Sequence, residues 1–269
     1  MGKIIAIASQ KGGVGKTTTT LNLGFSLSRF GSKVLLIDGD PQGGMAIASN
    51  LKKRTTLGLV DVLQGRCDAK EVVMTTKDQS LSIAGIGQPS PEEVFALEEA
   101  AHNGKLGELI RRIADGFDYV LIDAPAGIGS LVTALLAAAD GVILVIVPRM
   151  LSLKSLPSFL ALTQWVQQNK NAALSLEGVV LTMFNPTSPT ESSLLEEIKA
   201  SLPAEVFFRT VIPSEDLFEQ ASVRAIPVAL LPGGQQAAKP YLDLAMELKE
   251  RELLTQRGEQ DDDQTIGLF

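Results

Sequence analysis

Short apolar runs alternate with longer stretches of helical spacing along the 269-residue chain. Runs rich in Val, Ile and Leu predict buried strands, and the amphipathic stretches between most of them predict helices. We expect strands at residues 3–9, 33–38, 81–84, 119–123, 141–147, 178–183 and 210–212. Right-handed crossovers between such strands give an α/β fold, a doubly wound, mostly parallel sheet with helices on both faces.

The composition favours one domain with an aliphatic core. Hydrophobic residues make up 45% of the chain and aromatic residues only 5%, which suits a parallel sheet buried on both faces. We expect residues 1–254 to form the single domain and the acidic residues 255–269 to form a disordered tail. Residues 89–91 predict a loop and residues 92–101 a short acidic helix, and the sequence of residues 86–103 indicates no function.

Membrane, secreted and metal-cluster classes are disfavoured. The longest apolar stretches, 134–139 and 142–147, are too short to span a bilayer. The N-terminus enters the first strand directly, so no signal peptide is visible and we expect a cytoplasmic protein without a membrane anchor. Cys67 is the only cysteine, so it forms no internal disulfide and cannot alone build a zinc or iron–sulfur site. His102 is also alone, and a solvated surface position suits it best.

The segment KGGVGKTT at residues 11–18 lies between the first expected strand and a helix, where a phosphate-binding loop belongs. Its glycines let backbone N–H groups turn onto phosphate oxygens, and the following helix adds the positive end of its dipole. Lys16 would reach the β- and γ-phosphates, and Thr17 would bind Mg²⁺ through its hydroxyl. The residues expected to bind the nucleotide here are Gly12, Gly13, Gly15, Lys16, Thr17 and Thr18. The pattern predicts a P-loop NTPase.

Acidic residues follow two of the expected strands. Asp38 and Asp40 come after residues 34–37, and Asp123 follows residues 119–122. The carboxyl ends of strands in open α/β sheets are where ligands bind. Asp123 suits a carboxylate that holds Mg²⁺ through its water shell, although an Asp after a strand is as often a helix cap. Gly127 has no side chain to obstruct a backbone N–H aimed at the γ-phosphate.

A second lysine before the glycines makes the loop K-G-G-x-G-K-T, which resembles the deviant Walker A signature of the ParA/MinD family of dimerising ATPases. The resemblance covers residues 1–254 and implies an ATP hydrolase that is weak alone, forms an ATP-dependent homodimer and is stimulated by an activating partner protein. It also implies that Lys11 crosses the dimer interface to the partner's phosphates. A solvated loop lysine is the alternative. The expected cofactors are ATP and Mg²⁺.

The segment DGDPQ at residues 38–42 resembles the family's first switch. Similarity assigns Asp40 to the attacking water and Asp38 to a supporting role near the metal. The family usually continues with Gly-Asn, whereas this chain has Gly43 and Gly44. Residues 123–127, DAPAG, resemble the family's second switch, and this sequence is more similar to that of MinD than to that of ParA.

Two positions are expected on the adenine side of the nucleotide. Relatives place an Asn or Asp near Asn185 against the adenine ring, and the loop that begins at Pro213 resembles the family's second adenine-side segment. Asn185 precedes a proline, where Asn is also a routine turn former, so both roles stay open. The preference for ATP over GTP therefore rests on the resemblance.

The sequence gives opposing indications of the surface on which such a switch acts. A ParA-type dimer binds DNA nonspecifically through basic residues, but this chain carries 24 Lys and Arg against 31 Asp and Glu, a net charge of −7. A ParA-like stretch keeps Arg209, and acidic residues then follow at 215–216. The candidates for a basic patch are Arg149, Lys154, Lys199, Arg209, Arg224 and Lys239.

At the C-terminus, three consecutive aspartates at residues 261–263 would be repelled by anionic lipid, unlike the membrane-binding helix of a MinD-type protein. Two function classes remain. The first is a switch ATPase that positions or partitions DNA or a protein assembly in a bacterial cell. The second is a regulatory module whose ATP-bound dimer recruits or restrains a partner protein, with hydrolysis only resetting it.

Overall fold

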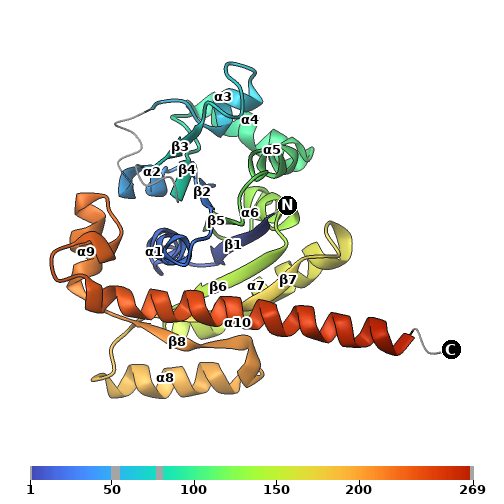
Figure 1. Ribbon diagram of the computed structural model, residues 1–269. Helices are drawn as coiled ribbons and strands as arrows, with labels where there is room; N and C mark the ends of the chain where they lie inside the picture. The colour runs from blue at the N-terminus through green and yellow to red at the C-terminus, as the bar shows by residue number, and fades with distance from the viewer. Residues whose placement is uncertain (1, 50–54, 77–80, 267–269) are drawn as a thin grey trace.

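A central sheet separates two layers of helices in the computed structural model, which describes residues 2–49, 55–76 and 81–266 (Figure 1). The strands are β1 (Lys3–Ser9), β2 (Val34–Asp38), β3 (Val73–Thr75), β4 (Leu81–Ala84), β5 (Tyr119–Ala126), β6 (Gly141–Ile146), β7 (Ser175–Phe184) and β8 (Phe207–Pro213). The helices are α1 (Lys16–Arg29), α2 (Gly44–Ala48), α3 (Leu59–Leu63), α4 (Pro91–His102), α5 (Lys105–Ile113), α6 (Ser130–Ala138), α7 (Met150–Asn169), α8 (Pro189–Ala200), α9 (Asp216–Arg224) and α10 (Gln235–Ile266), with short 3₁₀ turns η2 (Ala204–Val206) and η3 (Val228–Leu230).

The described strands form one eight-stranded sheet in the order β3-β4-β2-β5-β1-β6-β7-β8. Every neighbouring pair is parallel except β3 and β4. This order places β1 in the middle, with β5 and β2 on one side and β6, β7 and β8 on the other. The predicted doubly wound, mostly parallel α/β fold is confirmed.

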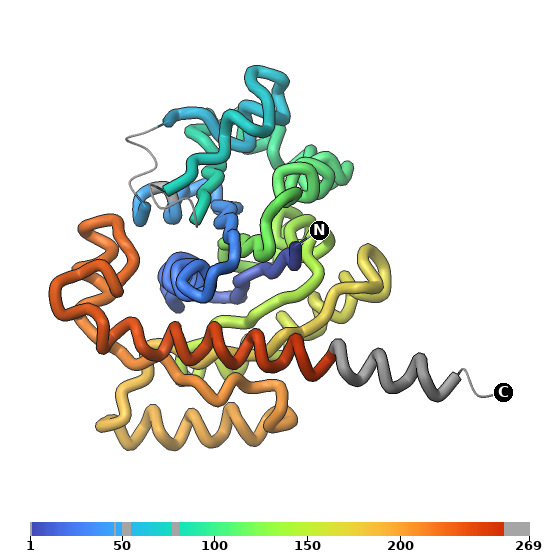
Figure 2. Tube along the Cα trace, in the orientation of Figure 1, coloured from blue at the N-terminus to red at the C-terminus, as the bar shows by residue number. Residues whose placement is uncertain are grey.

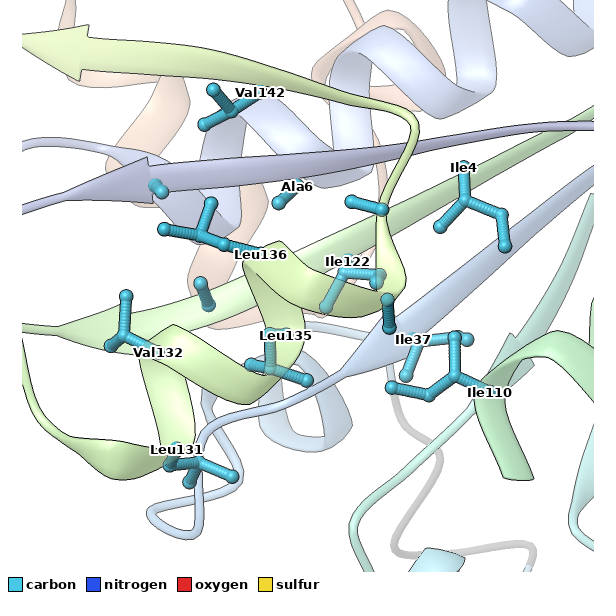
Figure 3. Close-up of a cluster of buried hydrophobic side chains, with 14 of the residues drawn as sticks. Ile4, Ala6, Ile37, Ile110, Ile122, Leu131, Val132, Leu135, Leu136 and Val142 are labelled. Carbon is cyan, nitrogen blue, oxygen red and sulfur yellow. The ribbon is translucent and has the colours of Figure 1, made fainter. Parts of the chain in front are cut away.

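Alternate residues of β1 feed two separate apolar cores. Ile4, Ala6 and Ala8 lie in the core shared with α3 to α8, whereas Ile5 and Ile7 lie in the core shared with α1, α2 and α10. Figure 3 shows part of the first core, where side chains of α6 lie against Ala6 of β1 and Ile122 of β5. Because both faces of the sheet are covered, its strands are almost continuously apolar.

All the expected strands are present, with some ends shifted. β5 continues to Ala126 because Ala126 pairs with Ser9 of β1, and β7 begins earlier than expected because Ser175 pairs with Gly141 of β6. The antiparallel edge strand β3 was not predicted, since three residues are too few to show a periodic pattern. The expected acidic helix is α4, whose first turn is capped by the hydroxyl of Ser90 accepting the N–H of Glu93.

Helix α10 crosses the molecule beside α1 and β8, as the orange-red segment in Figure 2 shows. Its backbone is helical to Ile266, whereas the acidic sequence predicts a disordered tail from residue 255. The division at residue 254 stays a prediction. No helix within the described ranges has both the length and the apolar character that crossing a bilayer requires.

Candidate nucleotide-binding site

The loop between β1 and α1 has the backbone shape of a phosphate cradle. Gly13 and Gly15 adopt left-handed conformations, with φ of 69° and 86°, which residues with a Cβ rarely enter. Gly15 is the N-cap of α1, and no side chain caps the N–H groups that follow it. These N–H groups and the positive end of the helix dipole are therefore free for an anion.

The two lysines of the loop have opposite environments. Lys16 is only 8% exposed. Burial lowers the pKa of its ammonium, and the nearby charges of Asp123 and Asp40 partly offset that effect. Lys11 is exposed, and its ammonium has no hydrogen-bond or ion-pair partner among the described residues. Lys16 is thus placed within the site of its own chain, whereas Lys11 is free to reach elsewhere.

Thr17 and Asp123 meet beneath the loop. The Thr17 hydroxyl donates to Oδ2 of Asp123 at 2.6 Å, and Asp123 is 1% exposed. Its Oδ1 has no hydrogen-bond partner among the described residues. Burial raises the pKa of Asp123 to about 7, the hydrogen bond from Thr17 acts in the opposite direction, and the charge of Asp38 adds to the rise.

This pair suits Mg²⁺. A buried carboxylate oxygen without a donor, beside a hydroxyl oxygen, offers the hard ligands that the ion prefers, and the ion would restore the ionised carboxylate. Within the described ranges, no three His, Cys, Asp or Glu side chains are grouped to hold a metal. Mg²⁺ at a nucleotide needs fewer, because phosphates and waters complete its shell.

The first-switch residues lie beside this pair. Asp38 is fully buried and stands opposite Asp123 in the register of β2 and β5, and its Oδ1 accepts the N–H of Asp40 at 3.2 Å. Asp40 is partly exposed, and its Oδ1 accepts the N–H of Gln42 at 2.9 Å. Asp40 therefore reaches the open side of the site, and Asp38 lies beneath it.

Asp123 does not cap a helix, so that alternative is wrong. It lies within β5, and the N-cap of α6 is Gly129. Gly44, which replaces the family's Asn, lies close to Thr17. A Cβ at Gly44 would lie 3.4 Å from the Thr17 hydroxyl oxygen, so a longer side chain there would contact the same hydroxyl.

Gly127 is placed differently from its expected role. It has φ of 111°, which favours glycine, and its N–H donates to the carbonyl of Ser9 at 3.3 Å. The bond continues the pairing of β5 with β1. A γ-phosphate would have to compete with Ser9 for this N–H, and the sensing role of Gly127 remains a prediction.

Asn185 and Pro213 lie on neighbouring segments, on the other side of β1 from Asp40. Pro213 pairs with Phe184 in the register of β7 and β8. Oδ1 of Asn185 accepts the N–H of Thr187 at 3.1 Å and its hydroxyl at 2.8 Å. The turn-forming role of Asn185 is thus present. Its contact with a base stays a prediction, as does that of Pro213.

Arg209 is held by acidic residues of α10. Its guanidinium lies 2.7 Å from a carboxylate oxygen of Glu250 and 3.6 Å from one of Glu247. Glu247 is 4% exposed and also accepts the backbone N–H groups of Arg209 and Thr210. Sequence reasoning missed Glu247, because nothing near it in the chain signals this pairing. The candidate basic residues are spread over α7, α8, β8, α9 and α10 and their caps.

Comparisons with known proteins identify the family to which the chain belongs. A family model described as an AAA domain matches residues 2–176. The sporulation initiation inhibitor protein Soj of Bacillus subtilis is 33% identical, over 92% of this chain and 98% of its own. The chromosome partitioning protein ParA of Caulobacter vibrioides is 32% identical, over 93% and 95%.

A solved structure of the septum site-determining protein MinD from Pyrococcus horikoshii, complexed with Mg-ADP, matches with a TM-score of 0.76. It is 25% identical, and the match covers 92% of this chain and 96% of MinD. The resemblance drawn from the phosphate loop is confirmed, and with it ATP and Mg²⁺ as the ligands. The chain therefore belongs to the ParA/MinD family of P-loop ATPases.

Proposed function

We propose that this chain is an ATP-dependent dimerising switch that positions or partitions DNA or a protein assembly inside the cell. The observation that carries the proposal is the contrast between Lys16, buried in its own loop, and Lys11, exposed at the edge of that loop. An exposed lysine beside a phosphate site can reach phosphates that are bound by a second copy of the chain. Both copies then neutralise the charge of the same phosphates, which would stabilise the dimer.

The proposed roles follow the geometry. Lys16 and the loop N–H groups bind the phosphates, with Gly12 and Thr18 at the ends of that contact. Thr17, Asp38 and Asp123 hold Mg²⁺, directly or through water, and the bound ion would neutralise charge that develops on the phosphates. Asp40 orients and polarises the attacking water from the open side of the site. These assignments are supported by placement and burial.

The names of the relatives support positioning or partitioning. ParA of Caulobacter vibrioides is a chromosome partitioning protein, and MinD of Pyrococcus horikoshii is a septum site-determining protein. The proposed place of action is the cytoplasm, because ATP and the cargo are there. An activating partner protein that speeds hydrolysis completes the cycle, since a switch that stays in one state does no positioning.

The second candidate is a regulatory module whose ATP-bound dimer recruits or restrains one partner protein. The printed name of the Bacillus subtilis relative, a sporulation initiation inhibitor, favours it. The acidic net charge and the pairing of Arg209 with Glu247 and Glu250 favour it over a cargo of DNA. Both candidates use the same nucleotide cycle, so ATP hydrolysis does not separate them.

A fluorescent fusion in the native cell separates the two candidates. Positioning predicts oscillation, a gradient or coating of the nucleoid, and loss of that pattern in Lys16→Ala, which cannot bind nucleotide productively. Recruitment predicts static co-localisation with one partner, again lost in Lys16→Ala. A uniform distribution of the wild-type fusion that Lys16→Ala leaves unchanged would contradict both.

A further inference from the structure

One hydroxyl ties the end of β7 to the phosphate loop. Thr182 is 2% exposed, and its Oγ1 lies 2.8 Å from the carbonyl oxygen of Val14 and 3.2 Å from that of Ile146. Val14 stands between the two left-handed glycines of the loop, and Ile146 ends β6. The buried side chain of Thr182 therefore fixes the position of the end of β7 relative to the phosphate loop.

The next residue has an unusual backbone. Met183 adopts a left-handed conformation with φ of 52°, which is unfavourable for a residue with a Cβ. Its Cε lies 3.5 Å from the position that a Cβ would take at Gly15, so the thioether end of the side chain lies over the phosphate loop. Met183 as a residue is still 37% exposed. A strained backbone that holds an apolar side chain in the open beside a binding loop suggests a ligand contact.

The layout of the sheet gives the direction in which a bound nucleotide runs. Thr17, Asp40 and Asp123 gather where β1, β2 and β5 end, so the γ-phosphate end lies there. β7 and β8 lie on the other side of β1. The triphosphate crosses the loop between these sides, and the base must leave toward the end of β7, where Met183 lies beside Gly15.

We propose that Met183 is the platform on which the flat face of the nucleotide base rests. Thr182 is the positioning residue that fixes the distance between the Met183 side chain and the phosphate loop. A thioether is polarizable and unbranched, and it makes favourable contacts with aromatic rings. The proposal rests on the proposed function, because it requires a nucleotide in the loop. It adds a contact with the flat face of the base, whereas Asn185 was expected at the edge of the adenine ring and Pro213 on the adenine side of the nucleotide.

Calorimetric titration of the full-length chain tests the platform with two probes, a nonhydrolysable Mg-ATP analogue and Mg-tripolyphosphate, which lacks a base. Met183→Ala should lower the affinity for the analogue about 3- to 10-fold and leave the affinity for tripolyphosphate unchanged. Met183→Leu, which keeps apolar volume, should retain most of the affinity. Met183→Gly relieves the backbone strain but removes the side chain, so it should weaken the analogue as Met183→Ala does.

Thr182→Val tests the positioning residue. It should weaken the binding of both probes, because the phosphate loop and Met183 lose the hydrogen bonds of the Thr182 hydroxyl. Thr182→Ser keeps that hydroxyl and should bind both probes as the wild type does.

The outcomes separate this proposal from the one on which it rests. Equal affinity of wild type and Met183→Ala for the analogue would overturn the platform, as would equal weakening of both probes by Met183→Ala. Wild-type affinity for the analogue in Met183→Gly would point to the backbone alone and would also overturn it. A wild-type chain that binds neither probe would contradict the nucleotide switch itself.

Discussion

Thr17 and Asp123 are 106 residues apart in the sequence, yet the hydroxyl of Thr17 donates to the carboxylate of Asp123 at 2.6 Å. The bond joins the first turn of α1 to β5, and it leaves the other carboxylate oxygen buried without a partner among the described residues. An unpartnered buried oxygen costs about 1–3 kcal/mol. Binding of the metal would remove that cost, so the unpartnered oxygen that destabilises the ligand-free protein prepares the site for Mg²⁺.

The first prediction concerns this pair. A bound ligand stabilises the folded state, by about 2.7 kcal/mol at 100 times its dissociation constant. Thr17→Val and Asp123→Asn should lose the part of the ATP-dependent rise in melting temperature that requires Mg²⁺, and Thr17→Ser should keep it. Thermal melting with an ATP analogue, with Mg²⁺ or with a chelator, gives the comparison. Wild-type Mg²⁺ dependence in Asp123→Asn would rule out its role at the metal.

Asp40 should separate binding from chemistry. Asp40→Ala leaves the phosphate loop and the metal pair intact, so the variant should bind ATP and dimerise but turn over at least about 100-fold more slowly. The expected state is a trapped dimer, seen as a dimer mass that persists after ATP is added. Phosphate release at the wild-type rate, with any activating partner present, would refute the assignment of the water to Asp40.

Local pattern was enough to predict the phosphate loop, because the strand, glycines, lysine, threonine and helix are contiguous. The first-switch aspartates were predicted for the same reason. Asp123 was assigned to the metal because the phosphate loop precedes it, although an Asp after a strand is as often a helix cap. The structure excludes the cap, because Asp123 lies within β5 and Gly129 is the N-cap of α6, and the metal role stays a prediction.

Contacts between distant segments were not predictable. Thr182 reaches Val14 across 168 residues, and Glu247 reaches Arg209 across 38. No local propensity places a carboxylate of a C-terminal helix on the edge of a sheet, since that contact depends on how α10 packs. β3 was missed because three residues give no periodicity to read.

DNA binding, if the protein uses DNA as its surface, should be weak. Arg209 is already neutralised by Glu250, so we expect binding that requires ATP and falls steeply between about 50 and 200 mM salt. Arg209→Glu should abolish it without affecting dimerisation, and Glu250→Gln should strengthen it by releasing Arg209. Mobility shifts on plasmid DNA give the measurement. Tight ATP-dependent binding at physiological salt would show that the charge argument is wrong.

The stability of the protein should depend on the negative charge of Glu247, which accepts hydrogen bonds from the backbone of β8. Burial alone would raise the pKa of Glu247, but the N–H groups of Arg209 and Thr210 and the guanidinium of Arg251 outweigh it and hold that pKa below its usual range. Glu247→Gln should therefore lower the free energy of unfolding at pH 7 by about 1–3 kcal/mol. Glu250→Gln, whose side chain is 62% exposed, should change it little.

Acid should remove the contribution of Glu247. A carboxyl whose pKa is lower in the folded than in the unfolded state stabilises the fold above its unfolded pKa, near 4.5. That stabilisation disappears as pH falls through the folded pKa. Urea unfolding should therefore give a difference between wild type and Glu247→Gln at pH 7 that shrinks below about pH 4. A difference that stays constant down to pH 3 would contradict the charged state of Glu247.

The central claim is that ATP joins two copies of this chain through Lys11, and light scattering tests it most directly. With Mg²⁺ and a nonhydrolysed ATP analogue, the wild-type mass should double. Lys11→Ala should stay monomeric while binding the analogue with nearly wild-type affinity, and Lys105→Ala, which removes an exposed lysine outside the loop, should dimerise normally. Equal dimerisation of wild type and Lys11→Ala would contradict the account.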